Sequence, residues 1–230
     1  MRNRFLFFFF FFVCGITMVN AQQFNLFDAE GKRHGKWQKK YPNSDQLRYE
    51  GTFDHGKEIG EFKFYKPSSG KSPTAIKVFS KNTDTVNVKY FTEKGKVISE
   101  GNMIGKERVG VWTYYHNGST KIMMTEEYSL GKLHGEQKTY FENGQLTEKT
   151  TYQEGKKEGK RFMYSDKGTV IKEFTYENDQ LHGITKYYDA QGKVKIEGNY
   201  KRDRKDGIWK YYENGKLKEQ KRFPVSKRGS

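Results

Sequence analysis

The stretch Gly-Val-Trp-Thr-Tyr-Tyr-His-Asn-Gly occupies residues 110–118, and Gly-Ile-Trp-Lys-Tyr-Tyr-Glu-Asn-Gly occupies residues 207–215. Its leading glycine returns every 24 to 26 residues along most of the chain. Self-similarity at such a period is typical of repeat architectures. We call these positions the phase glycines, and they predict about eight units over residues 35–223. They are Gly35, Gly60, Gly110, Gly135, Gly159, Gly183 and Gly207, with Val86 in the same position of one unit.

Two columns of aromatic side chains share this period. The first lies five residues after each phase position and comprises Tyr65, Phe91, Tyr115, Tyr140, Tyr164, Tyr188 and Tyr212, with Tyr41 displaced by one residue in the first unit. The second column comprises Tyr128, Tyr152, Tyr176, Tyr200 and Phe223. Aromatic residues are frequent in strands. Because the rings recur in phase with the turns, we expect both columns to form the core of a sheet.

Glycines at the midpoint of most units predict tight turns between short strands. Asn-Gly at 117–118, 143–144 and 214–215 is the typical sequence of a type I′ hairpin. The spacing predicts strands at 111–116, 120–128, 136–141 and 146–152, with connections such as 129–134. No window has a sustained helical period. The predicted fold is all-β, an elongated single-sheet solenoid of tandem antiparallel β-hairpins, with 66–84 as an enlarged loop.

The first residues have the features of a cleavable signal peptide. Arg2 and Arg4 precede an apolar run at 5–19, which ends near the small residue Ala21. We therefore expect export to the periplasm, the cell surface or the medium after cleavage near Ala21. The predicted organisation is a signal peptide at 1–21, a lead-in at 22–34, the repeats at 35–223 and a frayed basic tail at 224–230. Cys14, the one cysteine, belongs to the leader.

The recurring string at 110–118 and 207–215 resembles the bacterial variant of the MORN repeat, together with the Lys-x-x-Gly segments that end at Gly135 and Gly159 and the corresponding Arg-x-x-Gly segment that ends at Gly207. The resemblance covers nearly all of the chain after Asp28. It implies a β-hairpin repeat fold used for interaction with membranes or partner proteins, and no catalytic residue. Such bacterial proteins are commonly grouped with a YwqK-like antitoxin family. For an exported chain, the resemblance implies an immunity-like role in the envelope or outside the cell.

Motifs for catalysis are lacking in the sequence. There is no Gly-x-Ser-x-Gly elbow and no paired histidine and nucleophile, so we expect no enzyme activity and no cofactor. His34, His134 and His182 each precede a phase glycine, and the unit spacing separates them too far for one shared metal. We expect these histidines to be solvated turn residues. Acidic residues recur on the second strand of the units, and we expect them on a solvated face beside lysines. They are Glu126, Glu127, Glu148, Glu173 and Glu197.

The net charge of +15 favours an acidic partner. Basic runs at 201–205 and 216–228 point to lipid headgroups, acidic glycans or an acidic protein, and we do not expect an exported chain to bind nucleic acid. Trp37, Trp112 and Trp209 have strand parity opposite to the first aromatic column, so we expect them on the other face as partner contacts. The leading hypothesis is an exported binding or scaffold protein. The alternatives are an antitoxin or immunity-like protein and a peripheral binder of anionic membranes.

Overall fold

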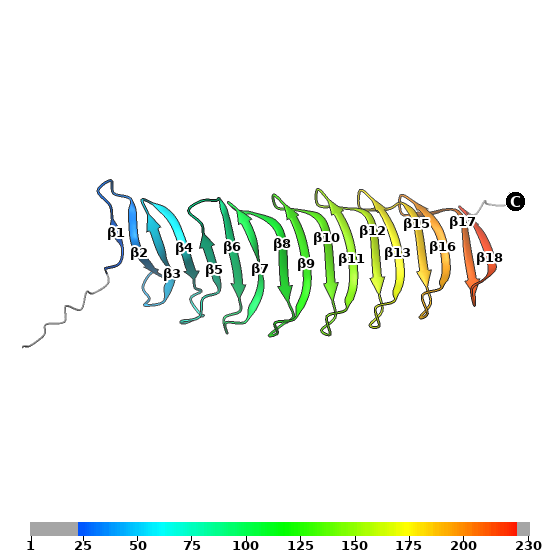
Figure 1. Ribbon diagram of the computed structural model, residues 1–230, viewed down its shortest axis with the longest axis horizontal. Helices are drawn as coiled ribbons and strands as arrows, with labels where there is room; N and C mark the ends of the chain where they lie inside the picture. The colour runs from blue at the N-terminus through cyan, green and yellow to red at the C-terminus, as the bar shows by residue number, and fades with distance from the viewer. Residues whose placement is uncertain (1–22, 225–230) are drawn as a thin grey trace, which may run out of the picture.

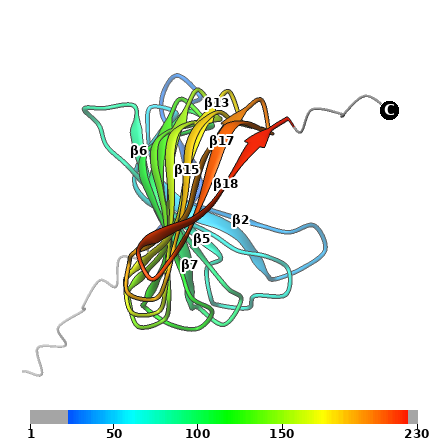
Figure 2. The same ribbon diagram turned by 90° about the vertical axis from the view of Figure 1, so that its right-hand side faces the viewer.

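The computed structural model describes residues 23–224 and contains one antiparallel sheet of 18 strands and no helix. Successive strands lie side by side along an elongated ladder (Figure 1). Seen along the ladder, the strands fan out because the sheet is strongly twisted (Figure 2). The all-β, single-sheet prediction is confirmed. Within the described range, no helix is long and apolar enough to cross a membrane.

The strands form eight successive hairpins after a short leading strand, β1. The lead-in predicted at 22–34 thus contains β1 and the beginning of β2. In one unit the first strand is divided at His182 into β14 and β15, which both pair with β13. The bounds are β1 Leu26–Phe27, β2 Arg33–Lys40, β3 Leu47–Asp54, β4 Lys57–Phe64, β5 Ala75–Phe79, β6 Thr85–Phe91, β7 Val97–Ile104, β8 Glu107–Tyr115, β9 Ile122–Ser129, β10 Lys132–Tyr140, β11 Leu146–Gln153, β12 Lys156–Tyr164, β13 Val170–Glu177, β14 Gln180–Leu181, β15 Gly183–Tyr188, β16 Val194–Lys201, β17 Arg204–Glu213 and β18 Lys216–Phe223.

The turns differ in type from the sequence prediction. A type I′ turn needs positive φ at both central residues, but Gly118 and Gly144 have positive φ whereas Asn117 and Asn143 do not. These midpoint turns are instead hydrogen-bonded loops that end in a left-handed glycine. Of the three Asn-Gly turns, the one at 214–215 has positive φ at both residues. The other two-residue turns of this kind join the units and have the central pairs His55-Gly56, Leu130-Gly131, Glu154-Gly155, Asn178-Asp179 and Arg202-Asp203.

The phase glycines lie inside strands, so the connection predicted at 129–134 was too long. Gly110 has φ of 64° and lies where five residues of β8, from Val109 to Thr113, oppose three of β7, from Glu100 to Asn102. This irregularity is a β-bulge, which needs the left-handed backbone that glycine adopts without strain. A similar register shift lies beside Gly60, Gly135, Gly159, Gly183 and Gly207.

Val86 shows what happens in a unit without the glycine. Strand β6 pairs with β5 without any register shift, and Val86 lies directly opposite Phe79. On its other side Val86 faces Met103. Every phase glycine, in contrast, faces an aromatic residue on the second strand of its own unit, as Gly110 faces Tyr128. Glycine, bulge and facing aromatic ring therefore occur together in six units and are all lacking in the Val86 unit, whereas Gly35 faces Phe53 without a register shift against β1. The other facing pairs are Gly35–Phe53, Gly60–Phe79, Gly135–Tyr152, Gly159–Tyr176, Gly183–Tyr200 and Gly207–Phe223.

The segment predicted as a loop at 66–84 contains strand β5. Five residues from Ala75 to Phe79 pair with both β4 and β6, so the irregular parts are confined to 65–74 and 80–84. Ile76 and Val78 satisfy the strand pattern, and the prolines at 67 and 73 lie before it. The leader at 1–21 and the tail after Pro224 lie outside the described residues.

Alternation along each strand gives the sheet two unlike faces. We call the side that carries Trp112, Tyr128 and Trp209 the tryptophan face. The opposite side, which carries Glu100, Glu173 and Glu197, is the glutamate face. No second layer covers either face in the described part of the chain, so burial arises from packing within the sheet itself.

Candidate binding surface

The tryptophans are sealed into the sheet. Trp112 and Trp209 are 0% and 1% exposed, because each indole lies against a glycine of the preceding strand. A β-carbon added at Gly101 would lie 2.5 Å from the Trp112 ring. The indole N–H of Trp112 donates to the Asn102 carbonyl at 2.9 Å, beside the bulge.

Cations cover the outer side of the rings. The Arg108 guanidinium carbon lies 4.5 Å from the centre of the Trp112 ring, and Lys205 Nζ lies 4.1 Å from that of Trp209. The exposure expected for Trp112 and Trp209 as partner contacts was therefore wrong. Trp37, which is half-buried, donates its N–H to the Leu26 carbonyl of β1 at 2.9 Å.

The middle of the tryptophan face is polar and internally hydrogen-bonded. Arg108 donates to the hydroxyls of Tyr114 and Tyr128, and Tyr128 donates to Glu126 at 2.7 Å. Gln137, in the column position of the tryptophans, donates to Glu126 at 2.8 Å. Glu126 is 7% exposed, so its predicted place on the solvated face was wrong.

Glu148 also lies on the tryptophan face, contrary to the prediction. It accepts from Arg161 at 2.7 Å and from Thr150 at 2.9 Å. Burying such groups requires partners within the protein. Because these partners are supplied by neighbouring strands, the network stabilises the sheet and leaves few donors for a ligand.

The glutamate face has an uninterrupted row of directly paired residues. The row takes one residue from each strand from β2 to β18 except β14 and is rich in lysine, so it forms a long charged strip across the sheet. We call it the central row. Its members are Gln38, Glu50, Lys63, Ile76, Lys89, Glu100, Thr113, Thr125, Lys138, Lys149, Phe162, Glu173, Lys186, Glu197, Lys210 and Gln220.

Tyrosines of the first aromatic column close over this row. Tyr115 donates its hydroxyl to Glu100, and this hydrogen bond raises the pKa of Tyr115 to about 12. Tyr188 donates to Glu173 at 2.9 Å. Burial and this bond raise the pKa of Tyr188 to about 12. Equivalent bonds join Tyr65 to Glu50 and Tyr212 to Glu197.

The sequence predicts that every member of this column lies in the core. The column is only partly buried. Tyr65 is buried at 7% exposure, but the other members are half-buried. Four of its hydroxyls bond to carboxylates of the central row, namely those of Tyr65, Tyr115, Tyr188 and Tyr212. The column thus orders the charged strip.

Lys138 and Lys149 face each other directly in the central row. Two like charges in this position would repel, and Glu136 offsets the repulsion by bonding Lys138 at 2.6 Å and Lys149 at 2.5 Å. These bonds lower the pKa of Glu136. Beside them, Lys160 binds Glu173 at 2.6 Å and Lys210 binds Glu197 at 3.1 Å. The lysine partners predicted for Glu173 and Glu197 are therefore present.

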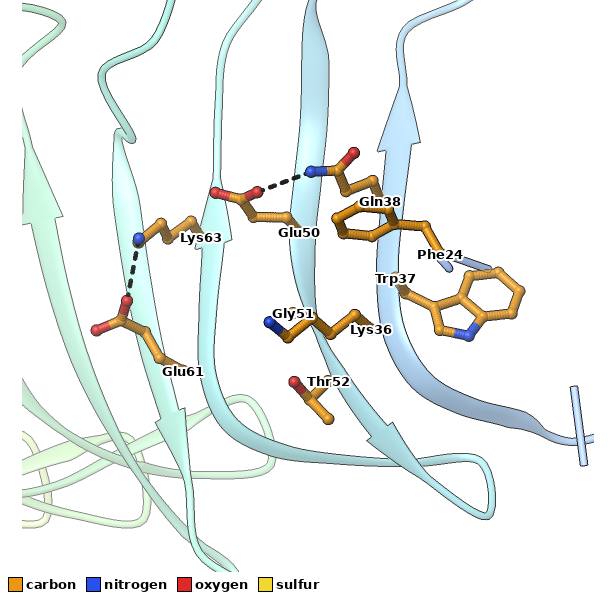
Figure 3. A pocket seen from close by; sticks show the side chains of 9 residues that line it. All are labelled: Phe24, Lys36, Trp37, Gln38, Glu50, Gly51, Thr52, Glu61 and Lys63. Carbon is orange, nitrogen blue, oxygen red and sulfur yellow. Dashed lines mark hydrogen bonds and ion pairs between the residues drawn. The ribbon is translucent and has the colours of Figure 1, made fainter. Parts of the chain in front are cut away.

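Exposed aliphatic side chains flank the central row. Val111, Ile184 and Ile208 each follow a phase glycine and are 53%, 58% and 45% exposed. Val78 lies on the same face and is 42% exposed. Near the N-terminal end, an open hollow on this side is lined by residues that include Glu50, the Glu61–Lys63 pair and Phe24 (Figure 3). The glutamate face thus combines charge with apolar area, as protein interfaces do.

The structure also brings together histidines that the sequence analysis kept apart. His34 and His55 have ring centres 4.9 Å from each other, with Asp54 between them. They were missed because His55 does not precede a phase glycine. The two-residue turn at 55–56 folds β4 back beside β3 and places His55 next to β2. A hairpin prediction across this turn would have revealed the pairing. His134 and His182 lie in other units.

These features define a β-hairpin repeat protein with buried tryptophan rings on one face, the tryptophan face, and a charged strip on the other, the glutamate face. Residues 133–154, 181–202 and 205–223 match the model of the MORN repeat variant. The matched segments cover the hairpins β10–β11, β15–β16 and β17–β18, so these three are MORN repeat variants. The similar string at 110–118 lies outside the matched segments. No curated protein matches the chain.

Proposed function

We propose that this is an exported, non-enzymatic scaffold that binds a partner protein with acidic groups through its glutamate face. The observation that carries the proposal is the central row, in which lysines recur across the length of the sheet beside exposed Val111, Ile184 and Ile208. Such a strip offers a long protein both ion pairs and apolar contact. The polar groups of the other face bond mainly to one another and are largely buried, with Arg161 Nε and Thr185 Oγ1 left without a partner among residues 23–224, so that face is the weaker choice.

The test compares two triple variants with equal loss of charge. The row variant is Lys63→Gln with Lys149→Gln and Lys186→Gln. The control changes exposed turn lysines and is Lys94→Gln with Lys167→Gln and Lys193→Gln. Each tagged protein is used to capture partners from the envelope and medium of its own host. We expect the row variant alone to lose its partner.

The outcomes separate the proposal from its alternatives. Equal loss in both triple variants would show that net charge alone drives capture, and would contradict the glutamate face as the binding site. One stoichiometric toxin-like protein would favour the antitoxin or immunity role of the YwqK-like family. Co-sedimentation of the protein with phosphatidylglycerol vesicles, without protein capture, would favour the peripheral membrane role.

Export has its own test. The protein isolated from its host is fractionated and its N-terminus is sequenced by mass spectrometry. Cleavage near Ala21 predicts a mature protein that begins at Gln22 and is found outside the cytoplasm. A cytoplasmic protein that retains residues 1–21 would contradict export.

A further inference from the structure

We propose that His34, Asp54 and His55 form a binding site for a divalent transition-metal ion, with Zn²⁺ as the ion to test. His34 comes from β2, Asp54 is the last residue of β3, and His55 lies in the turn between β3 and β4. One possible ligand atom from each residue lies within 4.8 Å of the other two. Imidazole nitrogen and carboxylate oxygen are normal Zn²⁺ ligands.

The hydrogen bond of His55 orients its ring for ligation. Asp28 Oδ2 lies 2.7 Å from His55 Nδ1, and Asp28 is in the turn between β1 and β2. A carboxylate accepts, so Nδ1 carries the proton and Nε2 presents its lone pair. This carboxylate–histidine arrangement is the usual support of a metal-binding imidazole.

The distances require only small side-chain movements. Asp54 Oδ1 lies 3.9 Å from His55 Nε2 and 3.8 Å from His34 Nδ1. Two ligands of one tetrahedral Zn²⁺ are roughly 3.3 Å apart, given bonds of about 2.0–2.1 Å. Rotation of these solvent-accessible side chains closes the difference and releases the hydrogen bond that His34 Nδ1 accepts from the His55 backbone N–H at 3.5 Å. Lys81, which binds the other carboxylate oxygen of Asp54 at 2.8 Å, leaves Oδ1 available.

The position of the site gives it a structural consequence. A metal ion there would join the β1–β2 end, through His34 and the Asp28 support, to the β3–β4 turn. Among residues 23–224, the first unit has only the two-residue strand β1 on its outer side, and terminal repeats lack the neighbour that stabilises inner ones. Metal binding would therefore fasten the N-terminal end of the sheet.

His134 provides a control built into the chain. It also precedes a phase glycine, but the adjacent unit-joining turn places Glu154 beside it, with His134 Nδ1 3.5 Å from Glu154 Oε1. That unit has one histidine where the first has two. His134→Asn should therefore leave metal binding unchanged.

The experiment is calorimetric titration of Zn²⁺ into the full protein, purified without a polyhistidine tag. We expect one equivalent to bind, and His34→Asn and His55→Asn each to weaken binding by at least about tenfold. Asparagine tolerates the left-handed φ of 47° at position 55. Circular dichroism verifies that each variant is folded, and Ca²⁺, which prefers six or more oxygen ligands, should not bind.

Histidine-selective NMR gives a second readout. Of the five imidazoles, those of His34 and His55 should shift on addition of Zn²⁺, and the melting temperature should rise in the wild type but not in the two ligand variants. Absence of binding, retention of binding in both ligand variants, or equal weakening by His134→Asn would each overturn the proposal.

Discussion

The ring of Trp112 lies on the backbone of Gly101, so close that a β-carbon at position 101 would approach the indole to 2.5 Å. The same relation joins Trp209 to Gly198 and Phe62 to Gly51. In each pair the glycine precedes the ring by eleven residues. A single sheet thus obtains fully buried side chains because one strand presents bare backbone to the ring of the next.

Gly101→Ala should lower the free energy of unfolding by about 1–3 kcal/mol, because the added methyl group forces the indole of Trp112 out of its position. Urea unfolding measures the loss. The double variant Gly101→Ala with Trp112→Val removes the clash, so the two substitutions should be non-additive. Simple additivity would show that the methyl group and the ring do not meet.

Gly110→Ala and Val86→Gly should both destabilise the protein, for opposite reasons. Alanine at 110 must adopt φ of 64°, which costs about 1–2 kcal/mol. Glycine at 86 enters a regular strand, where it costs about 0.5–1 kcal/mol of backbone entropy in addition to lost packing. Denaturant unfolding of both variants measures the effects. A neutral Gly110→Ala would contradict the role of the bulge.

Arg108→Met should lower the free energy of unfolding by about 1–3 kcal/mol, because it removes the cation from the Trp112 ring and the donors from Tyr114 and Tyr128. The tryptophan emission should shift to the red as the indole becomes hydrated. Arg204→Met, at an exposed strand end, is the control and should change neither quantity. An unchanged spectrum in Arg108→Met would mean that Arg108 does not seal the ring.

Tyr115 and Tyr188 of the glutamate face should ionise late in an alkaline titration. Their folded-state pKa is raised to about 12 for Tyr115 and Tyr188, above the value of about 10 in an unfolded chain. The stabilisation from this shift is complete below about pH 10 and is lost as the pH rises towards 12. Absorbance at 295 nm reports tyrosinate, and Tyr115→Phe should remove one phenol from the late fraction. Loss of a phenol that titrates near pH 10 would contradict the bond to Glu100.

The repeat and its hairpins could be predicted because glycine and aromatic residues mark each unit. The position of the phase glycines within strands could not be predicted, since a glycine with positive φ suits both a turn and a bulge within a strand. The alternation of side chains along a strand correctly placed Trp112 and Tyr115 on opposite faces, but it did not show which face is buried. That depended on Gly101 and Gly198 of the neighbouring strands, and the eleven-residue spacing to each tryptophan was the available clue.

The charge of the candidate surface could be predicted from the sequence, but its position on the sheet could not. Charge indicated an acidic partner, but the central row depends on the register of every strand pair, which the bulges shift. Glu126 and Glu173 lie on opposite faces because they stand two and three residues, respectively, before the tyrosines at 128 and 176. His55 could be placed beside His34 only after the two-residue turn at 55–56 was known.

Because the pairing of the central row is uninterrupted, the length of the charged strip increases in equal steps with the number of hairpins. Each hairpin adds two strands, or about 10 Å at about 4.8 Å per strand. The central-row residues of the hairpins before and after it stay in register. Duplication or loss of one unit in evolution therefore changes the reach of the charged strip by a fixed increment. The span of the partner can thus be matched by the number of units, without redesign of any one of them.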